Sequence, residues 1–129
     1  MKRTQVAGSR PVFLNLAQIQ LPVGALTSIA HRISGVILAF AIPAAVYALD
    51  LSLRSEQSYS SLVSLLAPRA VRVALVVIIW ALAHHLLAGI RHLLSDIDIG
   101  SLLRPARRSA WTVNVAGVAL ALIAAGALF

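Results

Sequence analysis

Four histidines and several arginines are the residues of this 129-residue chain best suited to chemistry, and most of them stand beside or inside long apolar segments. The sequence has no cysteine, which excludes thiolate metal ligands, iron–sulfur ligation and cysteine nucleophiles. His31 and Arg32 precede the first apolar run, and His84 and His85 lie within the second. Titratable or charged side chains inside a membrane are costly and by default functional, so these residues are the candidates for a site.

The composition indicates the medium in which that site must work. Apolar residues make up 60% of the chain and charged residues only 12%, whereas about a quarter of an average soluble domain is charged. This excludes a soluble globular enzyme. The net charge of +7 is interpreted as arginines that orient the chain against a membrane, because a nucleic-acid surface needs basic residues clustered on one face. No nucleic-acid partner is expected.

Three runs without charged residues predict the elements that position the candidates. A helix needs about 20 residues to cross ~30 Å of hydrocarbon, so the first run is long enough only if its helix begins near Gly24. Pro43 is expected to kink this helix and not to end it. The connections, about 52–68 and 96–108, are too short for a second domain. We predict a single all-α integral membrane domain, 1–129, with three transmembrane helices at about 25–50, 70–95 and 109–129.

The distribution of basic residues predicts the orientation of the chain. Residues 1–23 carry three basic residues and no acidic one, and residues 91–108 carry four arginines. By the positive-inside rule, the N-terminus and the second connection are cytoplasmic and the C-terminus faces outward. The mixed apolar and polar stretch Pro11–Leu21 is expected to lie in the membrane interface as a short segment ahead of the first span.

In this topology the polar candidates gather in the cytoplasmic half of the membrane. They are Ser28, His31, Arg32, His84, His85, Arg91 and His92. Ser28 and Arg32 are four residues apart and share a helix face, while His85, Gly89 and His92 form one stripe on the second helix. A histidine on an apolar helix wall suits haem iron, and a glycine one turn away leaves room for a flat ligand. An arginine near the membrane surface suits the haem propionates.

Three stretches resemble the cytochrome b membrane-anchor subunit, the larger of two anchors, of bacterial succinate dehydrogenase (succinate:quinone oxidoreductase, complex II). They are Arg10-Pro11, residues 28–36 (SIAHRISGV) and residues 85–92 (HLLAGIRH) followed by Asp96. The likeness covers essentially the whole chain, although the third span matches only as a generic apolar helix. It implies a multi-pass protein of the bacterial inner (cytoplasmic) membrane and a subunit of an oxidoreductase that does not itself oxidise succinate.

The resemblance also implies cofactors and partners. Haem b is shared with a second membrane-anchor subunit, ubiquinone is the substrate, and a flavoprotein subunit and an iron–sulfur subunit complete the complex. The axial ligand to the haem iron is the histidine four residues before the glycine, which is His85 and not its neighbour His84. The second axial histidine is expected from the other anchor.

The remaining motif residues receive binding roles by the same resemblance. Ser28 and Arg32 correspond to the quinone-binding positions, and no residue of the chain corresponds to a catalytic acid, base or nucleophile. His31, Arg32 and His92 correspond to contacts of the haem propionates. Arg91 matches the end of the motif, near the propionates or the iron–sulfur subunit.

Two other functions remain open from the residues alone. One is a self-contained respiratory cytochrome b that uses two of its own histidines, and such a protein shows a bis-histidine haem spectrum when expressed alone. The other is a non-redox subunit whose histidines and arginines line a proton or anion path. Taken singly, a histidine at membrane depth is also compatible with an ordinary contact between helices, and Arg91 and His92 with snorkelling to the headgroups.

Overall fold

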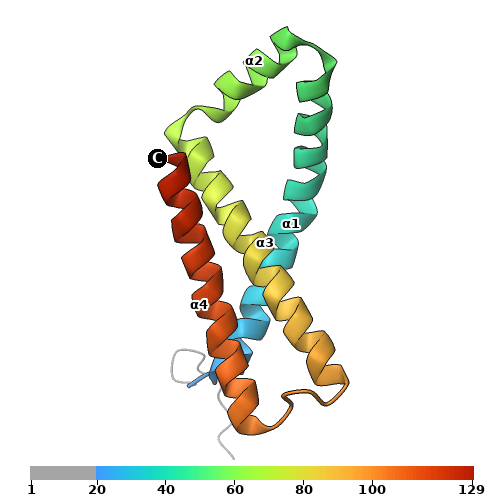
Figure 1. The fold of residues 1–129 in the computed structure, drawn as a ribbon, viewed down its shortest axis with the longest axis vertical. Coiled ribbons are helices and arrows are strands. Elements are labelled where there is room, and N and C mark those ends of the chain that lie inside the picture. Colours follow the sequence, from blue (N-terminus) through green and yellow to red (C-terminus); the bar gives the residue numbers. More distant parts are fainter. Residues whose placement is uncertain (1–19) are drawn as a thin grey trace, which may run out of the picture.

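The structure, a computed structural model, describes residues 20–129, and this part of the chain is all-helical apart from its connections. Its helices, in chain order, are α1 (Val23–Arg54), α2 (Glu56–Leu66), α3 (Arg69–Asp96) and α4 (Leu103–Leu128) (Figure 1). The predicted all-α class is therefore confirmed for the described residues. The predicted interfacial segment, 11–21, lies almost wholly outside them.

Three of the helices have the length and composition of membrane spans. α1, α3 and α4 contain 32, 28 and 26 residues, and each holds an apolar stretch long enough to cross a membrane. Their outer surfaces carry large apolar side chains, such as Phe40 at 78% and Leu122 at 67% exposure. Helices that are apolar all round face lipid or other apolar helices and not water, so the predicted three-span membrane protein is confirmed.

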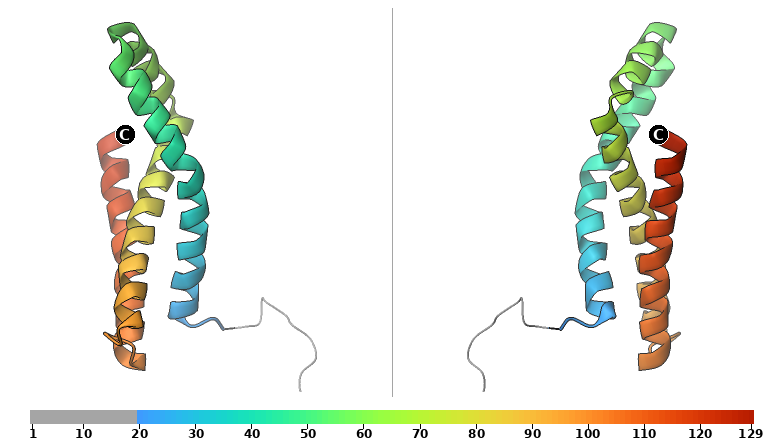
Figure 2. Two further views of the ribbon diagram at one scale, coloured as in Figure 1. Left: turned by 90° about the vertical axis from the view of Figure 1, so that its right-hand side faces the viewer. Right: turned by 90° about the vertical axis from the view of Figure 1, so that its left-hand side faces the viewer.

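α1 passes through a proline without ending. Pro22 is its N-cap, and Pro43 lies inside the helix, as the sequence predicts. A proline removes one backbone hydrogen bond and crowds the preceding turn, so it bends a helix that other contacts hold together. Figure 2 shows the axis of α1 changing direction part way along its length.

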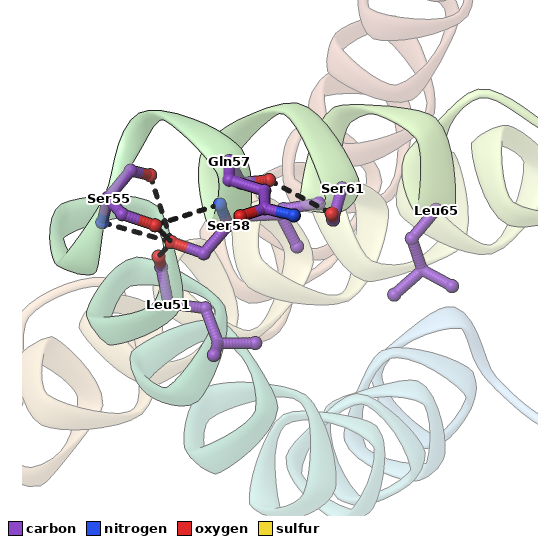
Figure 3. A pocket seen from close by; sticks show the side chains of 7 residues that line it. Leu51, Ser55, Gln57, Ser58, Ser61 and Leu65 are labelled. Atoms are coloured by element: carbon purple, nitrogen blue, oxygen red, sulfur yellow. Dashed lines mark hydrogen bonds between the residues drawn. The ribbon is translucent and has the colours of Figure 1, made fainter.

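The first connection contains a helix that the sequence analysis treated as a loop. Ser55 caps α2 by accepting from the backbone N–H of Ser58, whose own hydroxyl accepts from the backbone N–H of Ser55. A hollow of about 520 Å³ lies between α2 and the end of α1, near Leu51 (Figure 3). The hydroxyl of Ser58 lies 2.7 Å from the carbonyl oxygen of Leu51, so the serines of this hollow satisfy one another and the neighbouring backbone.

α4 begins earlier than its charge-free run. The helix starts at Leu103, so the three arginines expected in the second connection lie in its first turns. Pro105 is the third helical residue, where the backbone N–H has no partner within the helix in any case. Positive charge does not end a helix, and here it only marks where the apolar part of α4 begins.

Small residues bring α1, α3 and α4 close together. α3 packs against both α1 and α4, and Ala81, Ala88 and Ala110 are completely buried along its contacts. A Cβ on Gly117 of α4 would lie 3.4 Å from the Cβ of His84 on α3. Close approach over small side chains is typical of membrane helices, where dispersion contacts stabilise the packing. His84 is thus buried where α3 packs against α4.

Candidate functional site

His85 projects from α3 toward α1. Its Nδ1 lies 3.1 Å from the carbonyl oxygen of His31 and 3.3 Å from the hydroxyl oxygen of Ser34. Gly35 makes this approach possible, because a Cβ at that position would lie only 3.0 Å from Cε1 of His85. The ring is therefore held at a fixed place against α1 by two polar atoms and one glycine.

These contacts determine which nitrogen of His85 carries the proton. A carbonyl oxygen only accepts, and the hydroxyl of Ser34 already donates to the same carbonyl of His31 at 2.8 Å. Nδ1 must therefore be the N–H donor, and in the neutral ring Nε2 keeps its lone pair. Metal-binding histidines almost always donate their other N–H to a carboxylate, a backbone carbonyl or a water in this way. The ring of His85 thus fits an axial ligand of a metal bound through Nε2.

The ring of His31 lies beside the rings of both His85 and His92. The rings of His31 and His85 stack with centroids 4.1 Å apart and planes 18° apart, and the ring of His92 lies 5.2 Å from that of His31. The Nε2 atom of His31 is buried and has no hydrogen-bond partner in the described part of the chain. Three of the predicted site residues are therefore brought together by the fold.

The space beside Gly89 is not open, in contrast to what the sequence predicts. The glycine was expected to leave a flat space beside His85, but the ring of His31 covers it: a Cβ on Gly89 would lie 3.7 Å from Nε2 of His31. Within residues 20–129 no cluster of three or more histidines and carboxylates is arranged to hold a bare metal ion. The nitrogen of His85 would suit a metal held mainly by ligands from outside these side chains, such as the iron of a haem group.

His84, one residue earlier, points into the bundle instead. It is 1% exposed, and its Nε2 lies 3.1 Å from Oδ1 of Asn114 on α4. The hydroxyl of Thr27 on α1 lies 3.2 Å from the same oxygen. His84 and Asn114 therefore link α3 to α4, and the ring of His84 offers no accessible nitrogen to a ligand. Thr27 of α1 packs beside them, with its own proton directed to the carbonyl of Val23 at 2.9 Å. Sequence reasoning missed Thr27 and Asn114; the only signal was a lone amide within the third apolar run.

Ser28 and Arg32 lie one turn apart on α1, beside the histidine cluster. Ser28 is half-buried and Arg32 is exposed. At about 100° per residue they lie about 60° and 100° around the helix from His31. Both side chains lack a hydrogen-bond partner among the described residues. The chain thus presents a hydroxyl and an unpaired cation on one edge of the site.

The side chain of Arg91 binds α4 and does not join the histidine cluster. Its Nε donates to the hydroxyl of Ser109 at 3.0 Å and its Nη2 to the carbonyl of Ala106 at 3.3 Å, both on α4. Arg91 shares the α3 face of His84, about 100° from that of His92. The structure therefore separates the two neighbours at the end of the motif: His92 joins the histidine cluster and Arg91 braces α3 against α4.

Comparisons with known proteins show the family of this chain. Residues 7–124 match the family of succinate dehydrogenase/fumarate reductase transmembrane subunits. A succinate dehydrogenase cytochrome b556 subunit of Coxiella burnetii is 36% identical over 91% of this chain and 94% of its own length. Proteins of the same name from Paracoccus denitrificans and Rickettsia felis are 31% and 28% identical over 90% and 94% of the chain, and 89% and 94% of their own. The chain therefore belongs to the family of succinate dehydrogenase/fumarate reductase transmembrane subunits.

Proposed function

We propose that this chain binds haem b through His85 and helps to form the site at which electrons from succinate reduce ubiquinone. The observation that carries the proposal is the donation from Nδ1 of His85 to the carbonyl of His31, because it leaves Nε2 as the ligand atom. Haem b, when bound, supplies a one-electron carrier near the quinone. The names of the relatives, which are cytochrome b556 subunits, support this assignment.

His31, Arg32 and His92 would hold the haem propionates. The buried Nε2 of His31 has no partner within residues 20–129 and would gain one from a carboxylate. His92 lies next to it, and Arg32 is an exposed cation one residue away along α1. Charge-assisted hydrogen bonds to carboxylates are about twice as strong as neutral ones, so these three residues suit the anionic edge of the group.

Ser28 and Arg32 would bind the quinone. A quinone carbonyl gains negative charge as it is reduced, and donors placed at that oxygen stabilise the developing charge. The hydroxyl of Ser28 can donate one hydrogen bond, and the guanidinium of Arg32 supplies a positive charge with several N–H donors. Arg32 has no salt bridge to any of the four side-chain carboxylates, which all lie within residues 20–129, where a salt bridge joins Asp50 to Arg54.

The chain would act as one subunit of a larger succinate dehydrogenase complex. A flavoprotein and an iron–sulfur subunit would oxidise succinate and relay electrons, and a second membrane anchor would supply the other axial histidine. The exposed apolar surface of α1 and α3 is available to such an anchor. The charge distribution supports a bacterial inner-membrane protein with a cytoplasmic N-terminus, which puts the histidine cluster in the cytoplasmic half of the membrane.

The experiment compares His85→Leu with His84→Leu in the assembled complex. We expect His85→Leu to abolish or severely alter the b-type haem spectrum, because the ligand atom is lost. His84→Leu, the matched control from the adjacent position, should keep the spectrum, since Nε2 of His84 faces Asn114. The opposite pattern would move the ligand to His84. A bis-histidine spectrum from the chain expressed alone would favour a self-contained cytochrome.

A further inference from the structure

An apolar groove with one embedded cation lies between α3 and α4, on a different face from the histidine cluster. Its volume is about 370 Å³, and its lining includes Leu87, Ile90 and Val113 along the wall and Arg91 and Ser109 at the polar part. The groove reaches the α3–α4 connection, which the topology places at the cytoplasmic surface. The quinone and haem proposals use none of these residues.

Arg91 is a cation without a counter-charge from this chain. Within residues 20–129 its hydrogen bonds go to neutral acceptors, the hydroxyl of Ser109 and the carbonyl of Ala106. A guanidinium has five N–H donors, so further donors remain. The four side-chain carboxylates of the chain all lie in the described part, and none is within salt-bridge distance of Arg91. A half-buried guanidinium near the membrane surface whose acceptors are both neutral retains its full positive charge and attracts an anionic group.

The neighbours of Arg91 leave one side of its guanidinium open to an anionic group. Nη2 lies beside the start of α1, where a Cβ on Gly24 would be 3.9 Å away, and α4 holds the other side of the guanidinium. The histidine cluster lies on a face of α3 about 100° away. The open approach is therefore the groove itself, whose wall is apolar.

We propose that this groove binds an anionic phospholipid. The phosphate would take the free donors of Arg91, whose planar fork matches two phosphate oxygens at once. Ser109 would act by holding the guanidinium in place, because its own proton is directed to Ala106. An acyl chain would lie along Leu87, Ile90 and Val113. A soluble phosphate would gain no binding energy from the apolar wall, whereas a phospholipid would, and the bilayer contains the lipid.

The charge at this end of the chain favours the same occupant. The first turns of α4 carry three more exposed arginines, and basic pockets between helices on the cytoplasmic side bind acidic headgroups. They are Arg104, Arg107 and Arg108. Asp96 and Asp98 only partly offset this charge.

The test measures lipid binding to the whole complex, exchanged into phosphatidylcholine nanodiscs and titrated with phosphatidylglycerol of the same acyl chains. Native mass spectrometry counts the bound lipid. We expect tighter binding of phosphatidylglycerol than of phosphatidylcholine, weakened about tenfold or more by Arg91→Gln. Arg69→Gln, which removes one exposed charge at the other end of α3, is the matched control and should not weaken it.

A second variant tests the apolar wall with the charge unchanged. Ile90→Trp should fill the groove and weaken phosphatidylglycerol binding, whereas Val77→Trp, at a similarly exposed position on the same helix, should not. The haem spectrum should persist in every variant. Equal binding of the two lipids, full binding by Arg91→Gln and Ile90→Trp, or displacement of the lipid by inorganic phosphate would each overturn the proposal.

Discussion

Gly35→Ala is expected to weaken haem binding without unfolding the protein. The added Cβ would lie 3.0 Å from Cε1 and 3.4 Å from Nδ1 of His85. Carbon atoms in good contact are about 3.5–4.0 Å apart, so the ring must retreat from α1 by roughly 0.5–1 Å. The backbone itself favours alanine over glycine in a helix by up to about 1 kcal/mol, so α1 should form at least as well.

This displacement of the ring lengthens the hydrogen bond that orients His85. Nδ1 of His85 is 3.1 Å from the carbonyl of His31, and a further ~0.5 Å takes the pair beyond hydrogen-bond distance. Loss of one such bond removes about 0.5–1.5 kcal/mol. That free energy corresponds to about 2–13-fold in affinity, and changes to the partners of metal ligands typically cost about 10–100-fold, so we expect Gly35→Ala to weaken haem binding by about tenfold.

The assay is transfer of haem from the purified complex to excess apomyoglobin, followed by its absorbance. Gly126→Ala is the matched control, because a Cβ there meets no atom within 4 Å. We expect faster and more complete haem loss from Gly35→Ala, with the parental rate for Gly126→Ala and similar thermal stability for both. Equal haem retention by the two variants would refute the idea that contact with α1 orients His85.

Three other outcomes are expected. Ser28→Ala and Arg32→Leu should each lower succinate-dependent ubiquinone reduction by about 10²–10³-fold, while reduction of an artificial acceptor that takes electrons upstream survives; parental rates in both would move the quinone site elsewhere. Asn114→Ala should lower the free energy of unfolding by about 1–3 kcal/mol, because it leaves His84 buried without its partner, and Thr112→Val, exposed on the same helix, is the control for denaturant unfolding. Reporter fusions should place the N-terminus inside and the C-terminus outside; a cytoplasmic C-terminus would contradict the three-span topology.

The sequence predicts the spans and the membership of the histidine stripe because both depend on local periodicity. Apolar runs and helix geometry place His85 and His92 on one stripe of α3 and set His84 apart from it. The surroundings of the two adjacent histidines depend on other helices. Thr27 and Asn114 are 87 residues apart in the chain and meet only when α1 and α4 pack. No local pattern contains that contact, or the ring of His31 over Gly89.

The helix α2 and the early start of α4 were not predicted from the sequence, and the reason is different. Charged residues marked the ends of the predicted spans. A helix, however, ends where its backbone hydrogen bonds end, and charged residues can lie within its first turns. Ser55 followed by Glu56, with Pro68 two residues beyond Leu66, is a start and stop signal that predicts α2. For α4, Pro105 near the helix start is compatible with a first turn that includes the arginines.

We propose that this chain carries haem b on the path of electrons from succinate to quinone. The most direct measurement is a difference spectrum of the native complex purified through this chain, recorded before and after addition of succinate. We expect the flavoprotein, the iron–sulfur subunit and a second anchor to copurify, and succinate to produce the absorption band of a reduced b-type haem. A complex of the same composition without any b-type haem would contradict it.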